Sequence, residues 1–221
     1  MLPGVRLDVV ERSLPFLLAG AWMTLRLTSV AICLGVVIGT FVGMARISKS
    51  RVISAMAAVY VDFIRGTPLL VQIFLIHMGL PQLVGSPIPP DISALSALSI
   101  NSGAYVAEIV RAGIQSIHRG QMEAARSLGL SYIQAMRYVI LPQAFRRIIP
   151  PLGNEFIALL KDSSLVSVIA MEELVRKGQI VIGRTFRPFE IWIVVALIYL
   201  VLTLSISRLV AFTEKKLHVP G

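Results

Sequence analysis

Long stretches without a charged residue alternate along the chain with short charged segments, and they predict membrane-spanning helices. The four longest of these stretches are residues 27–45, 66–90, 92–107 and 191–207. A helix that crosses a bilayer needs about 20 mostly apolar residues. When each stretch is extended over its apolar neighbours, the predicted spans lie near residues 20–45, 53–79, 91–115 and 190–212.

A fifth span is predicted near residues 143–171, although charged residues and prolines interrupt it. The interrupting residues are Arg146, Arg147, Pro150, Pro151, Glu155, Lys161 and Asp162. Loops on the cytoplasmic side of a membrane carry an excess of Lys and Arg. We count the fifth span because the basic segments would otherwise fall on inconsistent sides of the membrane.

Basic residues gather in alternate loops, which fixes the predicted orientation. The first loop contains Arg46, Lys49 and Arg51, whereas residues 77–90 contain no Lys or Arg. Further basic residues follow the third span or lie in the C-terminal tail: Arg111, Arg119, Arg126, Arg137, Arg146, Arg147, Arg208, Lys215 and Lys216. Five spans then place the N-terminus outside and the C-terminus in the cytoplasm. The loop 172–190 fits badly, because its four basic residues would lie outside.

The composition agrees with an integral membrane protein and excludes several other classes. Apolar residues make up 56% of the 221 residues and charged residues 15%, whereas soluble domains carry about 45–50% and about 25%. Disordered chains and disulfide scaffolds are therefore excluded. We expect one all-α transmembrane domain over residues 1–221. The net charge of +9 is spread over loops, so no nucleic-acid partner is predicted.

Two carboxylates inside the fourth predicted span are the strongest candidates for a function. Glu155 and Asp162 are seven residues apart, which places them on the same helix face two turns apart. They can hold a cation or pair with Arg146 or Arg147 of another segment. Because ionisable groups inside a membrane usually line a pathway, we favour a role in transport for this pair.

Other polar residues lie within the second and third predicted spans. Asp62 and Arg65 share a helix face and can pair with each other, and the following Pro68 predicts a kink because it cannot donate to the Ile64 carbonyl. Asn101 and Ser102 lie in the middle of the third span. Side chains of this kind either connect helices or face a substrate, and the sequence leaves both interpretations open.

No catalytic or metal site is predicted. His77, His118 and His218 have no partner at the spacing of metal ligands, and no Ser-His-Asp order is present. The chain also lacks the Gly-x-x-x-x-Gly-Lys-Ser/Thr loop that cradles phosphates. We therefore expect no cofactor in this chain and no ATPase activity of its own.

The segment 116–142 is unusually long and polar for a loop between two spans. Arg119, Glu123 and Arg126 are spaced to form ion pairs along a short exposed helix, and Gly129 suits its end. Met122, Ala125 and Leu128 give this helix a weakly apolar stripe. Such a helix can dock into a groove on a partner or rest on the lipid surface.

This segment resembles the EAA loop of ABC-importer permease subunits. The resemblance rests on Glu123-Ala124-Ala125, three residues, Gly129, nine residues, and then Val139-Ile140-Leu141-Pro142. The family pattern ends Ile-x-Leu-Pro, so Val139 is a conservative departure. Further stretches are similar to the polar amino acid permeases of the histidine/glutamine type: residues 63–72, 101–105, 113–117 and 153–165. The similarity extends over about residues 15–215.

The resemblance implies the fold of a type I ABC importer permease with five spans. It implies that Gln121–Gly129 is a coupling helix that docks onto an ATPase subunit. The residues implied at this contact are Gln121, Glu123, Ala124, Ala125 and Gly129. Substrate contacts are implied at residues of the second to fourth spans, namely Asn101, Ser102, Glu155 and Asp162, with Thr67 and Leu70 near the pathway.

The resemblance thus predicts a permease subunit of an ATP-driven amino acid importer in the bacterial plasma membrane. The expected partners are two cytoplasmic ATPase subunits, a second permease subunit, an external solute-binding protein and the lipid bilayer. The two carboxylates favour a cationic substrate, but related permeases also take uncharged, acidic and opine-type substrates, so an opine or another amino-acid derivative is an alternative. An ion-coupled secondary transporter is the competing class, because intramembrane carboxylates also relay protons.

Overall fold

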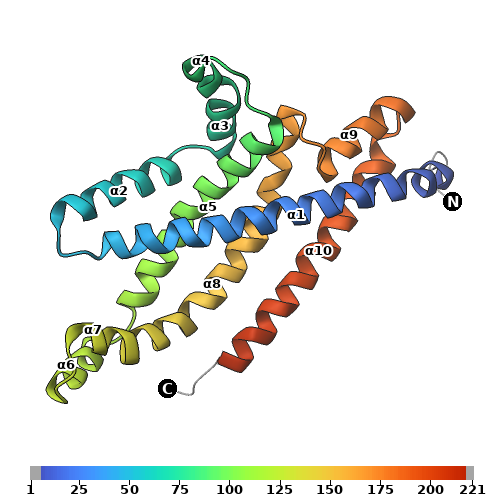
Figure 1. Cartoon of the computed structure of the whole chain (residues 1–221). Coiled ribbons are helices and arrows are strands. Elements are labelled where there is room, and N and C mark those ends of the chain that lie inside the picture. The colour runs from blue at the N-terminus through green and yellow to red at the C-terminus, as the bar shows by residue number, and fades with distance from the viewer. Residues whose placement is uncertain (1–5, 218–221) are drawn as a thin grey trace.

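Helices form the regular structure of residues 6–217, which are the residues described by the computed structural model (Figure 1). The four longest are α1 (Leu7–Arg46), α5 (Pro90–Gln115), α8 (Leu141–Asp162) and α10 (Pro188–Leu217). In Figure 1, α8 lies between α5 and α10, and all three run in a similar direction while α1 crosses them obliquely. The all-α fold class predicted from the sequence is confirmed.

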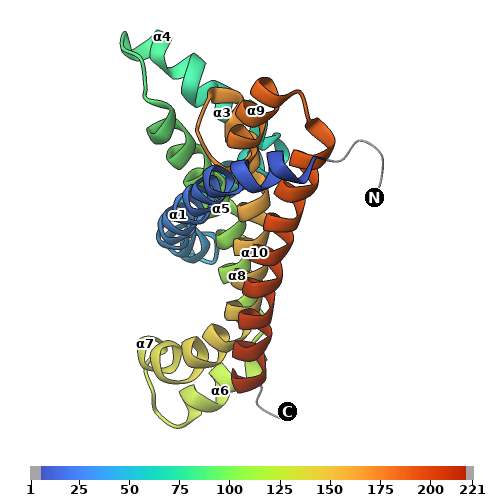
Figure 2. The same cartoon turned by 90° about the vertical axis from the view of Figure 1, so that its right-hand side faces the viewer.

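Shorter elements lie at the two ends of this bundle. They are α2 (Arg51–Gly66), α3 (Leu69–Phe74), the π-helix η1 (Leu75–Gly79), α4 (Leu80–Val84), α6 (Arg119–Ser127), α7 (Tyr132–Ala135), the π-helix η2 (Met136–Ile140), the 3₁₀-helix η3 (Ser163–Ile169) and α9 (Leu174–Thr185). Figure 2 shows α3, α4 and α9 at one end and α6 and α7 at the opposite end. The C-terminal end of α10 lies at the same end of the bundle as α6, whereas the N-terminal end of α1 lies towards the opposite end.

By length and composition, α1 and α10 are the helices of the described chain that can each cross a membrane. The bent pair Arg51–Gly66 and Leu69–Val84 makes a third if it counts as one span. Serines and Asn101 make α5 more polar, and arginines make α8 more polar. The five-span topology therefore stays a prediction.

Helix α1 is longer than a membrane is thick. Its 40 residues correspond to about 60 Å at 1.5 Å per residue, against a hydrocarbon core of about 30 Å. The predicted span near residues 20–45 covers only its C-terminal part. The N-terminal part packs elsewhere, because Leu17 of α1 shares a buried cluster with Leu174 of α9 and Ile191 of α10.

Glycines on α1 allow its backbone to approach α5 closely. Gly35, Gly39 and Gly43 recur every four residues and therefore lie on one face of α1. A Cβ atom at Gly39 would lie 2.5 Å from the Val106 Cβ atom and 2.7 Å from the Gly103 carbonyl oxygen. Small residues at this spacing let helices pack tightly in membranes, where dispersion contacts drive association. The α1–α5 pair is the most extensive helix contact in the described structure.

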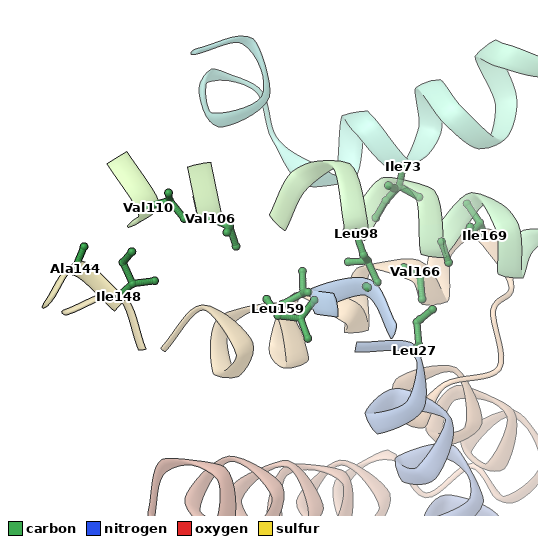
Figure 3. Close-up of a cluster of buried hydrophobic side chains, with 14 of the residues drawn as sticks. Leu27, Ile73, Leu98, Val106, Val110, Ala144, Ile148, Leu159, Val166 and Ile169 are labelled. Carbon is green, nitrogen blue, oxygen red and sulfur yellow. The ribbon is translucent and has the colours of Figure 1, made fainter. Parts of the chain in front are cut away.

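The main hydrophobic core lies where α1, α3, α5, α8 and η3 meet (Figure 3). Leu98 of α5 and Leu159 of α8 are fully or almost fully buried there, together with Val166 of η3. Leu27 of α1 and Ile73 of α3 belong to the same cluster. This core fixes α5 and α8, the two helices that carry most of the predicted pathway residues.

The second predicted span is broken into two arms. Helix α2 ends at Gly66, and the chain bends by 105° before the segment Leu69–Val84. Pro68 donates no hydrogen bond, so the Ile64 carbonyl loses the partner that a continuous helix would give it. The Gln72 Nε2 atom takes that place at 2.7 Å from the Ile64 oxygen. The bend expected at Pro68 is thus confirmed, and it is larger than a kink within one straight span.

Both π-helices directly precede a proline near the start of the next helix. The second residue of α4 is Pro81, and the second residue of α8 is Pro142. A proline ring clashes with the carbonyl four residues earlier and donates no hydrogen bond. A wider π-turn accommodates this defect. The Val139–Pro142 part of the motif therefore forms the joint between α8 and the short helices α6 and α7.

The poorly fitting basic loop contains α9, and two of its basic residues are paired locally. The Lys177 Nζ atom lies 3.9 Å from a Glu172 oxygen, and an Arg187 nitrogen lies 3.7 Å from a Glu190 oxygen. Lys177 also lies over the Phe16 ring, 4.2 Å from its centroid. Two of the four positive charges of this loop are therefore offset by neighbouring carboxylates.

A buried carboxyl group fastens α9 to its neighbours. Glu173 precedes α9 and accepts hydrogen bonds from the backbone N–H groups of Val175 and Arg176, at 2.9 and 2.7 Å. The Tyr199 hydroxyl of α10 donates to the same carboxyl group at 3.3 Å. Burial raises the pKa of Glu173 to about 7, although these hydrogen bonds oppose the shift.

Candidate functional site

Glu155 and Asp162 both belong to α8, and their spacing of seven residues places them on one face of this helix. Glu155 is half-buried and faces Ser102 of α5, whereas Asp162 is exposed at the end of α8. Neither carboxylate forms a salt bridge with another described residue. Arg147 does not pair with them, since it donates to the Ser116 carbonyl at 2.6 Å. Both carboxylates are thus available for a cationic group.

Ser102 and Asn101 occupy different environments. The Ser102 hydroxyl is buried with no partner at hydrogen-bonding distance among the described residues. Asn101 is buried and donates through Nδ2 to the Gln72 Oε1 atom at 3.0 Å. One face of α5 therefore contacts α8, and the neighbouring face is connected to the broken second span.

Gln72 is the residue of this site that the sequence interpretation missed. Its Nε2 atom lies 2.7 Å from the Ile64 oxygen, 3.1 Å from the Thr67 oxygen and 3.0 Å from the Thr67 Oγ1 atom. Thr67 and Leu70 are half-buried. The available signal was a polar residue four positions after Pro68 in an otherwise apolar segment, since that position can replace the hydrogen bond lost at the proline.

Glu108 of α5 lies close to arginines of three helices. It accepts hydrogen bonds from Arg46 of α1 and, at 2.8–3.2 Å, from Arg111 of its own helix. Arg65 of α2 lies farther from it, at 3.9 Å. Asp62 approaches Arg46 at 3.9 Å and not Arg65, so the Asp62–Arg65 pair expected from the sequence is not formed.

The predicted coupling segment forms the short helix α6 at one end of the bundle (Figure 1). Gln121, Glu123 and Ala124 are exposed, whereas Ala125 is buried against the neighbouring elements. The Gln121 Oε1 atom accepts a hydrogen bond from Gln143 of α8 at 3.4 Å. Helix α6 is thus fixed to the start of α8 on one side and open on the other.

Gly129 ends this element with a left-handed backbone. Its φ is +86°, a conformation that glycine adopts without a steric penalty. The Leu130 N–H bonds to the Ala125 carbonyl at 3.2 Å, and the Arg126 side chain donates to the Leu130 carbonyl at 2.8 Å. The stop expected at Gly129 is therefore present, and α6 itself covers Arg119–Ser127.

Within residues 6–217, no group of three or more His, Cys, Asp or Glu side chains is arranged to hold a metal ion. His77 lies 2.9 Å from the Ser93 hydroxyl, and His118 accepts from the Gly120 N–H at the start of α6. Both contacts are explained by helix packing and helix capping. His218 lies outside the described residues.

Comparison with known proteins identifies the family. Residues 35–219 match the binding-protein-dependent transport system inner membrane components. The chain belongs to this family. The glutamine transport system permease protein GlnP of Escherichia coli (strain K12) is 43% identical over 208 residues, which cover 94% of this chain and 95% of that protein. The arginine transport system permease protein ArtQ of Bacillus subtilis (strain 168) is 40% identical over 204 residues, covering 92% and 93%.

A solved structure agrees with this assignment. The crystal structure of an amino acid ABC transporter with histidines contains a chain that is 48% identical, with a TM-score of 0.92. The match covers 96% of this chain and 99% of that one. The fold is that of a type I ABC importer permease, as the sequence resemblance implied. The chain is an inner membrane transport component, and permeases of this family work with an ATPase and a binding protein.

Proposed function

We propose that this chain forms the translocation pathway of an ATP-driven importer for polar amino acids and couples it to ATP hydrolysis on a separate subunit. The observation that carries the proposal is the position of α6. This helix lies at one end of the bundle, exposes Gln121, Glu123 and Ala124, and is joined to α8 through η2 and Gln143. A movement imposed on α6 from outside is therefore transmitted to the helix that carries Glu155 and Asp162.

The arrangement of charges supports a five-span topology for this function. The α6 end of the bundle also contains the C-terminal end of α10, with Lys215 and Lys216. The positive-inside rule assigns this end to the cytoplasm, where two ATPase subunits bind α6 and its counterpart in a second permease subunit. The N-terminal end of α1 and helix α9 then lie outside, where a solute-binding protein delivers the substrate.

The substrate class follows from the pathway residues and from the relatives. Glu155 and Asp162 present two carboxylates without a salt-bridge partner in the described chain, and such a pair favours a substrate with an ammonium or guanidinium group. The relatives are named for glutamine and for arginine transport. All amino acids carry an ammonium group, so a polar amino acid fits these observations whether or not its side chain is charged.

Uptake of radiolabelled arginine and glutamine into vesicles that contain the complete importer tests this proposal. Uptake is expected to need ATP on the α6 side and to be lost in Glu123→Gln, while the amount of subunit in the membrane is unchanged. Glu214→Gln is the matched control, because Glu214 is an exposed carboxylate near the end of α10. Uptake driven by an ion gradient without ATP, or retained in Glu123→Gln, would contradict the proposal.

A further inference from the structure

Arg65 has an unusual environment for an arginine in a predicted membrane span. It lies in the last turn of α2, just before the break at Pro68. Its guanidinium lies over the Tyr105 ring of α5, 5.2 Å from the centroid. The Arg65 side chain is 42% exposed. It makes no hydrogen bond with another described residue, and its ion pair with Glu108 is long, at 3.9 Å. A guanidinium has five N–H donors in a fixed fork, so this group has unused donors.

The neighbouring carboxylate, Glu108, does not accept a hydrogen bond from the Arg65 guanidinium. Glu108 lies 3.9 Å from it and already accepts hydrogen bonds from Arg46 and Arg111. The side chain of the second acid nearby, Asp62, is 74% exposed, and within residues 6–217 it pairs with Arg46 and not with Arg65. Three guanidinium groups thus share two carboxylates in this region, which leaves a surplus positive charge between α2 and α5.

Helix α8 carries negative charge that no basic residue neutralises by a salt bridge within the described chain. Its carboxylates Glu155 and Asp162 are seven residues apart on one face of the helix. Helix α5 packs against both α2 and α8, so the cationic group at Arg65 and the anionic group at Glu155 belong to two helices that pack against the same helix. A free amino acid has the complementary distribution of charge, with a carboxylate at one position and an ammonium group at another.

We propose that the Arg65 guanidinium binds the α-carboxylate of the transported amino acid and so makes the pathway selective for substrates that carry this group. The Tyr105 ring holds the guanidinium plane by a cation–π contact. Arginine suits this task because its two parallel N–H groups match the two oxygens of a carboxylate. The inference rests on the proposed function as an amino acid importer, and it adds a specificity residue on α2 to the carboxylates of α8.

Pairs of probes that differ only in the carboxylate test this role. The probes are L-arginine with agmatine, and L-glutamine with 4-aminobutanamide. Their dissociation constants are measured by calorimetry on the purified complex of the permease with its partner subunits, without the binding protein, which has its own selectivity. A charge-assisted hydrogen bond of this kind changes affinity by about ten- to hundredfold. The wild type is therefore expected to bind each amino acid at least about tenfold more tightly than its amine.

In Arg65→Gln the affinity for the amino acids is expected to fall until each pair binds about equally, while the affinity for the amines stays within about twofold. Arg65→Lys is expected to keep an intermediate preference, since it retains the charge without the fork. Arg46→Gln is the matched control, because it removes another guanidinium from Glu108. It is expected to keep the full preference.

The outcomes separate this inference from the proposed function. A merely structural role for Arg65 would weaken both members of a pair equally, and an unchanged ratio in Arg65→Gln would overturn the inference while leaving the importer function intact. Retained binding of the amines shows that the variant is folded. A wild type that takes up amino acids with ATP but binds acids and amines equally would likewise refute carboxylate recognition at Arg65. Failure of ATP-driven uptake in the wild type would instead refute the importer function.

Discussion

Gly39→Ala is expected to destabilise the contact between α1 and α5. A Cβ atom at this position would lie 2.5 Å from the Val106 Cβ atom, 2.6 Å from its Cγ1 atom and 2.7 Å from the Gly103 carbonyl oxygen. Val106 is fully buried, and the third contact is with backbone. Neither neighbour can move aside by a simple rotation of a flexible side chain, so the two helices must separate.

The expected magnitude follows from this overpacking. Inserting a methyl group into a well-packed core costs about 1–3 kcal/mol. Alanine also stabilises a helix by up to about 1 kcal/mol relative to glycine. A control variant is needed to subtract this effect of helix propensity. Gly183→Ala in α9 is that control, because a Cβ atom there meets nothing within 4 Å. The difference between the two variants therefore isolates the clash.

Thermal unfolding of the two variants in the same detergent checks the prediction. About 2–4 °C per kcal/mol is typical for chains of this length, so Gly39→Ala is expected to unfold about 2–12 °C below Gly183→Ala. Melting temperatures that agree within about 1 °C would refute the reasoning, since they would mean that α1 and α5 are not packed backbone to backbone at this point.

The remaining predictions concern the broken span, α9 and the pathway. Gln72→Leu leaves the Ile64 carbonyl without its hydrogen bond and is expected to lower the free energy of unfolding by about 1–3 kcal/mol, measured by denaturant unfolding. The pKa of Glu173 is raised from 4.5 to about 7 by burial, so the folded state holds this proton more tightly than the unfolded state. Stability from this group should fall as pH rises from about 4.5 to about 7, and the slope of melting temperature against pH should flatten in Glu173→Gln. Glu155→Gln combined with Asp162→Asn should reduce uptake of arginine more than uptake of glutamine, and equal uptake by the wild type and the double variant would assign both residues a structural role.

The sequence predicted the elements whose limits are set by local features. Helices α5 (Pro90–Gln115) and α10 (Pro188–Leu217) cover the segments 91–115 and 190–212, because charged or proline residues bound each apolar stretch. That these helices cross the membrane as the five-span topology requires stays a prediction. The bend at Pro68 and the stop at Gly129 were likewise predictable, since each depends on the backbone of a single residue. The family motifs added the fold, which composition alone does not specify.

Tertiary contacts that join distant segments were not predictable in this way. Asp62 and Arg65 share a helix face, yet each approaches a partner on another helix. Their spacing permits a pair, but the positions of Arg46 and Glu108 decide which pairs form. The same holds for Gln72 and Asn101, because both belong to apolar segments and only the packing of α3 against α5 brings them together.

The glycine face of α1 and the selectivity proposed for Arg65 are connected through α5. Close packing at Gly39 fixes the rotation of α5, because Val106 and Gly103 must face α1. Tyr105 precedes Val106 in the helix and therefore points about 100° away, to where the Arg65 guanidinium lies over its ring. A variant that forces α1 away from α5 should consequently rotate or displace Tyr105 as well. If Gly39→Ala is destabilised as expected, it should also lose part of the preference for substrates with a carboxylate, although residue 39 belongs to α1 and Arg65 to α2.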